Sequence, residues 1–285
     1  MRSKHLLGII VFISLLLATF LSGSAYAVTN GQPDSGNNWP YVGLVVVDEW
    51  NGSDIVPMWR GTGSLISPTV VLTAGHLTEN ALAARVWFDV GPIKAVWDDP
   101  PGHYPYAGPD SVEAAEIYTH PDYEIYGSPA LPEWISHDVG ILILSEPVYL
   151  SEYGLLPDEG LVDTLKMMTP VDQVGYGVQE MWRGGGQPFW YGLRMRYFAP
   201  AGLITSKHVF SDEFMKLTAN SAKGKGGTAF GDSGGPNLLG ATNIILGVTS
   251  WGTNYECAGV SYVQRVDTAD VLDWICTEFG SLLQP

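Results

Sequence analysis

The sequence predicts an all-β protein that ends in one α-helix, and three observations support this prediction. Glycine and proline are frequent, with 34 and 19 residues, whereas charged residues make up only 15% of the 285 residues. This composition is typical of short strands joined by many turns. Apolar runs recur that are too short for typical helices, and a single segment near the C-terminus has apolar residues at helical spacing.

Four short apolar runs are expected to form strands, because they are rich in Val and Ile and end at turn-forming residues. These runs cover residues 41–47, 69–73, 139–144 and 244–250. Two proline-rich stretches, at 99–102 and 129–132, are expected to form surface loops.

The C-terminal segment is expected to form a helix that begins at Asp267 or Thr268, since both residue types cap helices well. Its apolar side chains share one face at helical spacing, at Val271, Trp274, Ile275 and Phe279.

The first 27 residues have the pattern of a secretory signal peptide. A basic start at Arg2 and Lys4 precedes an apolar run over 6–21, and small residues at Ala25 and Ala27 precede the expected cleavage point. A membrane anchor is the alternative, but the run is shorter than the roughly 20 apolar residues that a spanning helix needs. The sequence therefore predicts an extracellular protein, residues 28–285, with no stable membrane association.

Charge and cysteine content exclude two further classes. The chain has 14 basic and 30 acidic residues, a net charge of −16, whereas binding a phosphate backbone needs clustered Lys and Arg, so nucleic-acid binding is excluded. Only Cys257 and Cys276 are present, so no disulfide framework holds the fold. The sequence leaves open whether these two cysteines are bridged.

The sharpest local motif is Gly-Asp-Ser-Gly-Gly-Pro at 231–236. A serine hydroxyl becomes a strong nucleophile only when a base removes its proton and N–H groups hold the oxyanion that forms. Glycines allow the tight turn that presents such N–H groups. By itself the motif is also compatible with a flexible turn.

Two other residues would supply the missing chemistry. His76 follows the apolar strand that ends in Leu-Thr-Ala-Gly, and Asp138 lies where a loop enters the apolar run 139–144. Alone, His76 would be interpreted as a structural histidine and Asp138 as a turn residue.

The order His76, Asp138, Ser233 resembles that of the trypsin/chymotrypsin family of serine peptidases. Four further segments resemble motifs of that family, namely His120-Pro121-Asp122-Tyr123, Val174-Gly175-Tyr176-Gly177, Ser250-Trp251-Gly252 and Asp273-Trp274-Ile275. The resemblance extends over nearly all of the chain that follows the signal segment.

The resemblance implies two six-stranded antiparallel β-barrels with a cleft between them. The first barrel would span 28–150, the second 151–265, and the C-terminal helix and tail 266–285. A polypeptide would be the substrate, and the protein would act as a monomer without cofactor or metal.

The resemblance also implies a role for each motif. Ser233 would attack the scissile carbonyl, His76 would move the proton, and Asp138 would orient the imidazole. The N–H groups of Gly231 and Ser233 would bind the oxyanion.

A pocket for the side chain before the scissile bond is implied as well. Family members that cleave after Lys or Arg carry an acid at the position of Gly227. Because a buried cation without a counter-charge is costly, Gly227 and Thr228 favour apolar or aromatic side chains, unless Glu256 reverses this preference. The other substrate-binding residues would be Phe230, Ser250, Trp251 and Gly252, the last three aligning the peptide as an added strand.

Zymogens of the family become active when a freed Ile or Val α-amine pairs with the Asp beside the nucleophile. Signal cleavage would expose Val28, so we expect Val28 and Asp232 to form this activation pair, although Thr29 and Asn30 depart from the family pattern. The chain also has Leu77 and Ala229 where family members usually carry cysteines.

Other classes fit the sequence less well. A catalytically silent binding protein on the same scaffold would usually lack a member of the triad. An esterase would show a Ser-Asp-His order and a Gly-x-Ser-x-Gly elbow. A metal hydrolase would need closely spaced ligands, which the histidines do not provide, at His76, His103, His120, His137 and His208.

Overall fold

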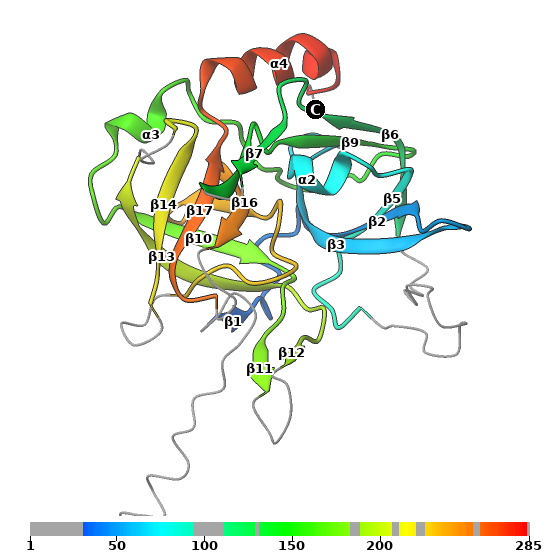
Figure 1. Ribbon diagram of the computed structural model, residues 1–285, viewed down its shortest axis with the longest axis horizontal. Coiled ribbons are helices and arrows are strands. Elements are labelled where there is room, and N and C mark those ends of the chain that lie inside the picture. The colour runs from blue at the N-terminus through cyan, green and yellow to red at the C-terminus, as the bar shows by residue number, and fades with distance from the viewer. Residues whose placement is uncertain are drawn as a thin grey trace, which may run out of the picture.

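Strands dominate the computed structural model (Figure 1). The structure describes residues 31–93, 111–128, 131–182, 189–206, 211–220, 226–252 and 257–283. The predicted signal segment, Val28, the stretch 99–102 and Glu256 lie outside these residues. Among the described residues, no helix has the length and apolar character that crossing a membrane requires.

The first barrel is a closed ring of antiparallel strands with an apolar interior. Leu44, Val71 and Ile141 are completely buried there. In ring order the strands are β2 (Val42–Trp50), β3 (Ile55–Leu65), β4 (Val70–Thr73), β9 (Gly140–Leu144), β6 (Val112–Thr119) and β5 (Ala83–Trp87).

The second barrel is also antiparallel, and pairing between its first and last strands closes it. In ring order it consists of β13 (Tyr197–Thr205), β10 (Pro170–Gly175), β15 (Pro236–Leu239), β16 (Ile245–Gly252), β17 (Gly259–Arg265) and β14 (Phe214–Ala219). The short strand β1 (Gln32–Pro33) pairs with β13, so the described chain starts on this barrel before it enters the first. The two six-stranded barrels confirm the predicted fold class.

The four predicted strands are confirmed as β2, β4, β9 and β16. The loop expected at 129–132 is wrong for Leu131 and Pro132, because these residues begin β8 (Leu131–Ser136), which forms a hairpin with β7 (Glu124–Ser128). The remaining elements are α2 (Gly75–Thr78), α3 (Leu161–Thr164), β11 (Glu180–Trp182), β12 (Phe189–Tyr191) and η2 (Gly280–Leu282).

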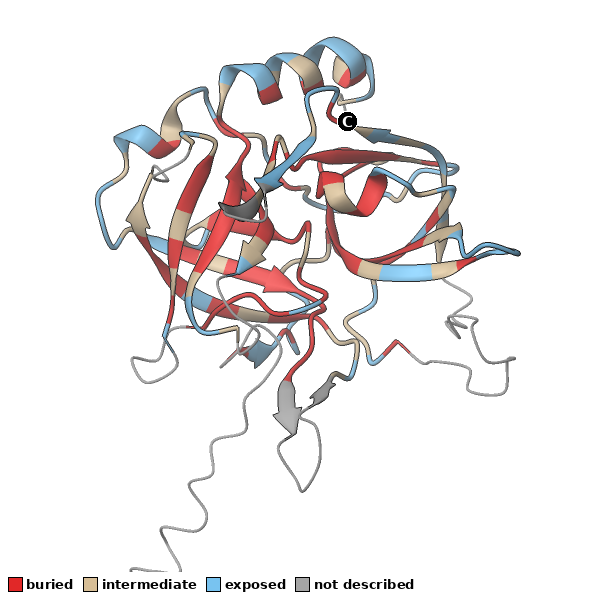
Figure 2. Cartoon of the chain, in the orientation of Figure 1, coloured by how far each residue is buried: buried red, intermediate tan, exposed pale blue. Residues whose placement is uncertain are grey.

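The predicted C-terminal helix is α4 (Ala269–Phe279), which follows Thr268. It lies across the top of both barrels, with a buried stripe toward them (Figures 1 and 2). Val271, Ile275 and Phe279 form this stripe. Cys276 is exposed on the same helix and forms no disulfide with Cys257.

Candidate active site

Strand pairing in the first barrel brings His76 and Asp138 together. Thr73 at the end of β4 pairs with Gly140 at the start of β9, so the residues that follow β4 meet those that precede β9. The backbone N–H of His76 donates to Asp138 Oδ1 at 2.8 Å, and His76 Nδ1 lies 2.9 Å from Asp138 Oδ2. Asp138 therefore fixes both the backbone and the ring of His76.

Asp138 is completely buried, and both its carboxylate and its backbone N–H are hydrogen-bonded. The Ser250 hydroxyl donates to Oδ2, and the backbone N–H of Asp138 donates to Gln264 Oε1 at 3.0 Å. Burial by itself would raise the pKa of Asp138, but the neighbouring His76 and the hydrogen bonds from His76 and Ser250 hold that pKa below its usual value. The carboxylate is thus kept ionised.

The pKa of His76 is shifted in the opposite direction to that of Asp138. Burial would lower the pKa of His76, but the charge and hydrogen bond of Asp138 raise that pKa above its usual value. With Nδ1–H directed to the carboxylate, the neutral ring carries its lone pair on Nε2.

The loop that carries Ser233 is pressed against the first barrel. The backbone N–H of Thr62 donates to the Ser233 carbonyl at 2.7 Å, and the Thr62 hydroxyl donates to the Gly231 carbonyl at 2.9 Å. Gly234 has a φ of +77°, and a Cβ there would lie 2.4 Å from the Thr62 carbonyl oxygen. Glycine is therefore required for this close approach.

The N–H of Gly231 is oriented by the peptide unit to which it belongs. The Phe230 carbonyl accepts a hydrogen bond from Val178 N at 2.8 Å. Because a trans peptide is planar, the N–H of Gly231 points away from this bond. Gly231 has a φ of +96°, a conformation that favours glycine.

The N–H of Ser233 is fixed in the same way, since the Asp232 carbonyl accepts a hydrogen bond from Gly235 N at 2.8 Å. The Asp232 carboxylate is buried and accepts from Gly177 N and Ala229 N, each at 2.8 Å. Within the described part of the chain, the N–H groups of Gly231 and Ser233 have no acceptor, which leaves them available for an oxyanion.

His76 and Ser233 line the same cleft, a cavity of about 640 Å³. In the described chain the Ser233 hydroxyl makes no hydrogen bond with the imidazole, as is often the case before substrate binds. The walls include residues from both barrels and from the β7–β8 hairpin, namely Trp59, Arg60, Leu77, Tyr123, Ile125, Ile135 and Phe230.

A second cavity, of about 430 Å³, opens beside Ser233. The residues predicted to bind substrate that line it are Thr228, Phe230, Ser250, Trp251 and Gly252. Gly227 does not line it, because this residue is buried against Ala219, whose Cβ lies 2.4 Å from where a Gly227 Cβ would be. None of the described lining residues carries a charge.

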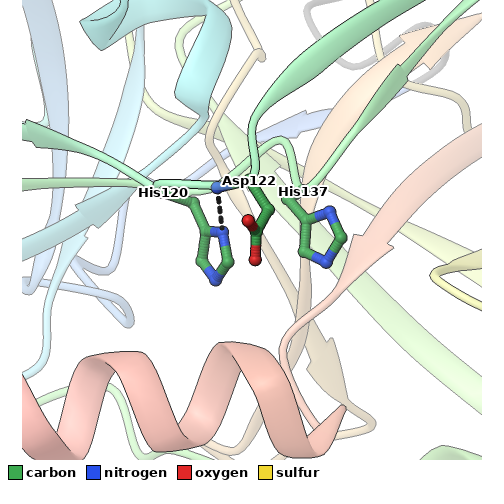
Figure 3. Close-up of side chains that lie close together, drawn as sticks. All are labelled: His120, Asp122 and His137. Atoms are coloured by element: carbon green, nitrogen blue, oxygen red, sulfur yellow. Dashed lines mark hydrogen bonds between the residues drawn. The ribbon is translucent and has the colours of Figure 1, made fainter.

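His137, the residue that immediately precedes Asp138, forms a cluster with His120 and Asp122 (Figure 3). Nitrogen and oxygen atoms of His120, Asp122 and His137 lie within 4.8 Å of one another, so this group could hold a metal ion, although residue spacing predicted none. His120 Nδ1 accepts from Asp122 N at 3.2 Å, and His137 Nε2 lies 2.6 Å from Asp270 Oδ2. The buried His120 Nε2, by contrast, has no hydrogen-bond partner among the described residues. The contact between His137 and Asp270 ties the residue before Asp138 to the start of α4.

Sequence reasoning missed the structural roles of three residues. Ser250 was expected to align substrate, and its hydroxyl also holds Asp138. Thr62 and Gln264 were not predicted at all, although they orient the Ser233 loop and the Asp138 backbone. No local pattern marks them, because each acts on a residue far away in the sequence.

Comparison with curated proteins gives relatives of moderate similarity. Venom serine protease Bi-VSP from Bombus ignitus is 27% identical over 252 residues, which cover 85% of this chain and 65% of the relative. Brachyurin from Leptuca pugilator is 26% identical over 262 residues, which cover 89% of this chain and 99% of the relative. The chain thus spans about two thirds of the first relative and nearly all of the second.

Solved structures support the fold. An HL collagenase superposes with a TM-score of 0.61 at 18% identity, covering 90% of this chain and 96% of that chain. A mutant of human heparin binding protein gives a TM-score of 0.56 at 16% identity, covering 88% of this chain and 95% of that chain.

The Trypsin family model matches residues 28–275. The chain therefore belongs to the Trypsin family of serine-type endopeptidases.

Proposed function

We propose that the protein hydrolyses peptide bonds with Ser233 as nucleophile, His76 as general base and acid, and Asp138 as the residue that orients His76. The observation that carries this proposal is the buried Asp138 carboxylate, which holds His76 in the cleft where Ser233 also lies. The His76–Asp138 pair has the hydrogen bonds that these roles require, and Ser233 lines the same cleft as His76.

In the proposed reaction the Ser233 hydroxyl oxygen attacks the scissile carbonyl carbon, and His76 Nε2 takes the hydroxyl proton. The carbonyl oxygen becomes an oxyanion that accepts hydrogen bonds from the N–H groups of Gly231 and Ser233. His76 then gives the proton to the leaving amine, and the C–N bond breaks. Water releases the acyl group from Ser233 through the same steps in reverse.

The alternative is a catalytically silent binding protein. Retention of His76, Asp138 and Ser233 disfavours it, as does the supply of two oriented N–H groups beside the serine. Turnover of a peptide library distinguishes the two functions.

For the acyl side of the substrate we propose a preference for apolar or aromatic residues over Lys and Arg. The described lining of the smaller cavity is uncharged, and the Thr228 hydroxyl donates to Ser261 Oγ at 3.0 Å. A buried cation would find no carboxylate among these described residues and would lose its hydration.

A set of peptide p-nitroanilides tests this preference. We expect Phe and Leu substrates to exceed Lys and Arg substrates in kcat/KM by about 10-fold or more. Thr228→Asp should reduce this ratio by adding a carboxylate, whereas Thr228→Ser should retain it. Equal cleavage after Lys and Phe in the unaltered protein would contradict a neutral pocket.

We further propose that residues 1–27 direct export, that the mature chain acts outside the cell as a monomer, and that the α-amine of Val28 pairs with Asp232. The support is the buried position of the Asp232 carboxylate within the Ser233 loop. N-terminal sequencing of the exported protein should begin at Val28.

One added alanine before Val28 is expected to reduce turnover by at least about 100-fold, because the displaced amine would no longer supply a positive charge to the buried carboxylate. As the control, a protease-cleavable extension should give an inactive protein that recovers activity when cleavage restores Val28. Full activity of the extended protein would reject this activation mechanism.

A further inference from the structure

Arg60 is a cation of the cleft that lacks a partner in the described chain. The protein has 30 acidic and 14 basic residues, and Arg85, Arg196 and Arg265 each pair with a carboxylate. The Arg60 side chain, by contrast, makes no hydrogen bond or ion pair with any described residue, although the residue is partly buried. A partly desolvated guanidinium without an acceptor is unfavourable, which suggests that an acceptor arrives with a ligand.

The guanidinium lies beside the proposed oxyanion site. A Cβ built on Gly231 would be 3.5 Å from Arg60 Nε, and one built on Gly192 would be 3.4 Å from an Arg60 terminal nitrogen. The two glycines thus leave space that the guanidinium occupies. Arg60 lines the larger cleft with His76 and Ser233 but does not line the smaller cavity.

This position is on the side of Ser233 that the leaving part of a substrate would occupy. A peptide whose acyl side chain fills the smaller cavity continues past Ser233 along the larger cleft. There it meets Arg60 and Leu77 of the first barrel together with Gly231. A carboxylate near the start of the leaving segment would match the planar fork of donors on Arg60.

The acidic residues of the cleft do not neutralise this position. Glu79 is engaged by the Tyr123 hydroxyl and lies 3.5 Å from Asn80 Nδ2, on the wall that carries Tyr123. Glu49 lies on β2 three residues beyond Val46, which pairs with Arg60, and is therefore roughly 10 Å further out along the hairpin.

We infer that Arg60 binds a carboxylate on the leaving-group side and makes the enzyme select substrates with a negative charge within the first two residues after the scissile bond. The carboxylate can come from an Asp or Glu side chain or from the C-terminus of a short substrate. This inference rests on the proposed function, because the proposed function places the acyl side of the substrate in the smaller cavity and therefore its leaving side in the larger cleft.

The test uses internally quenched peptides that share Phe before the scissile bond. One amidated set carries Glu, Gln or Lys at the first or second leaving position, and another carries Gln with a free C-terminal carboxylate at the second position. The turnover of each is measured for the unaltered protein and for Arg60→Gln, Arg60→Lys and Arg60→Glu. Arg85→Gln, which removes an arginine outside the cleft, is the charge-matched control.

We expect the unaltered protein to prefer Glu over Gln by roughly 5- to 10-fold in kcat/KM, mainly through KM. Arg60→Gln should bring this ratio near one, Arg60→Lys should keep part of it, and Arg60→Glu should favour Lys. The amidated and free-acid sets show which carboxylate is used. A ratio within twofold in the unaltered protein, or a ratio that persists in Arg60→Gln, would overturn the inference.

Binding of the same peptides to Ser233→Ala, with and without Arg60→Gln, separates this inference from the proposed function. A preference for Glu that depends on Arg60 in binding, without any turnover by the unaltered protein, would retain the carboxylate site and reject the hydrolytic role. Turnover without any charge preference would retain the hydrolytic role and reject the carboxylate site.

Discussion

Ser233→Ala is expected to lower kcat for peptide hydrolysis by roughly 10⁵- to 10⁶-fold, because no other group can form the acyl intermediate. The residual rate should come from substrate binding and from the N–H groups of Gly231 and Ser233, which the substitution leaves in place. Hydrolysis of an unstructured protein such as casein and of a Phe p-nitroanilide measures the effect.

The fold of Ser233→Ala should be intact, since the Ser233 carbonyl and not its side chain anchors the loop to Thr62. Its melting temperature should stay within a few degrees of that of the unaltered protein. Ser145→Ala, at an exposed serine, serves as the control and should keep full activity. Appreciable hydrolysis by Ser233→Ala would remove this serine from the mechanism.

Asp138→Asn should lower kcat by roughly 10⁴-fold at neutral pH, because an amide cannot hold the ring in the required tautomer or stabilise its positive charge. His76 must be neutral to accept a proton, so activity of the unaltered protein should fall as the pH drops through the raised pKa of His76. Without the carboxylate that raises this pKa, the acidic limb of the variant should move to lower pH.

A pH profile of kcat/KM measures both effects of Asp138→Asn. Asp158→Asn, at an exposed aspartate, controls for the loss of one negative charge and should leave rate and profile unchanged. Ser250→Ala should cause a smaller loss with a shift in the same direction, because it removes one hydrogen bond to Asp138. An unshifted limb in Asp138→Asn would show that this carboxylate does not control His76.

Much of the barrel architecture was predictable because its strands have a local signature. β4 and β9 are short, continuous apolar runs between turn residues, and such runs are buried in the barrel interior. β8 lacked this signature, since Pro132 argued for a loop, yet pairing with β7 makes it a strand. β1 has only two residues and depends entirely on β13 for its hydrogen bonds.

The residues of the candidate site were predictable where a reactive residue type lies in a recognisable motif. They were not predictable where contacts between distant parts of the chain determine the role of a residue. His76, Asp138 and Ser233 were selected by residue type, order and flanking residues. The displacement of Gly227 from the cavity depends on packing against Ala219, and the support of Asp138 by Ser250 and Gln264 depends on the meeting of two barrels. The unpaired state of Arg60 among the described residues is likewise a property of the folded chain alone.

Labelling with a serine-directed fluorophosphonate, followed by mass spectrometry of the peptides, tests most directly whether the cleft activates Ser233. We expect a single modified serine, Ser233, in the unaltered protein, much slower labelling in Asp138→Asn, and none in Ser233→Ala. A folded and N-terminally processed protein that takes up no label, or takes it up at another serine, would contradict the proposed mechanism.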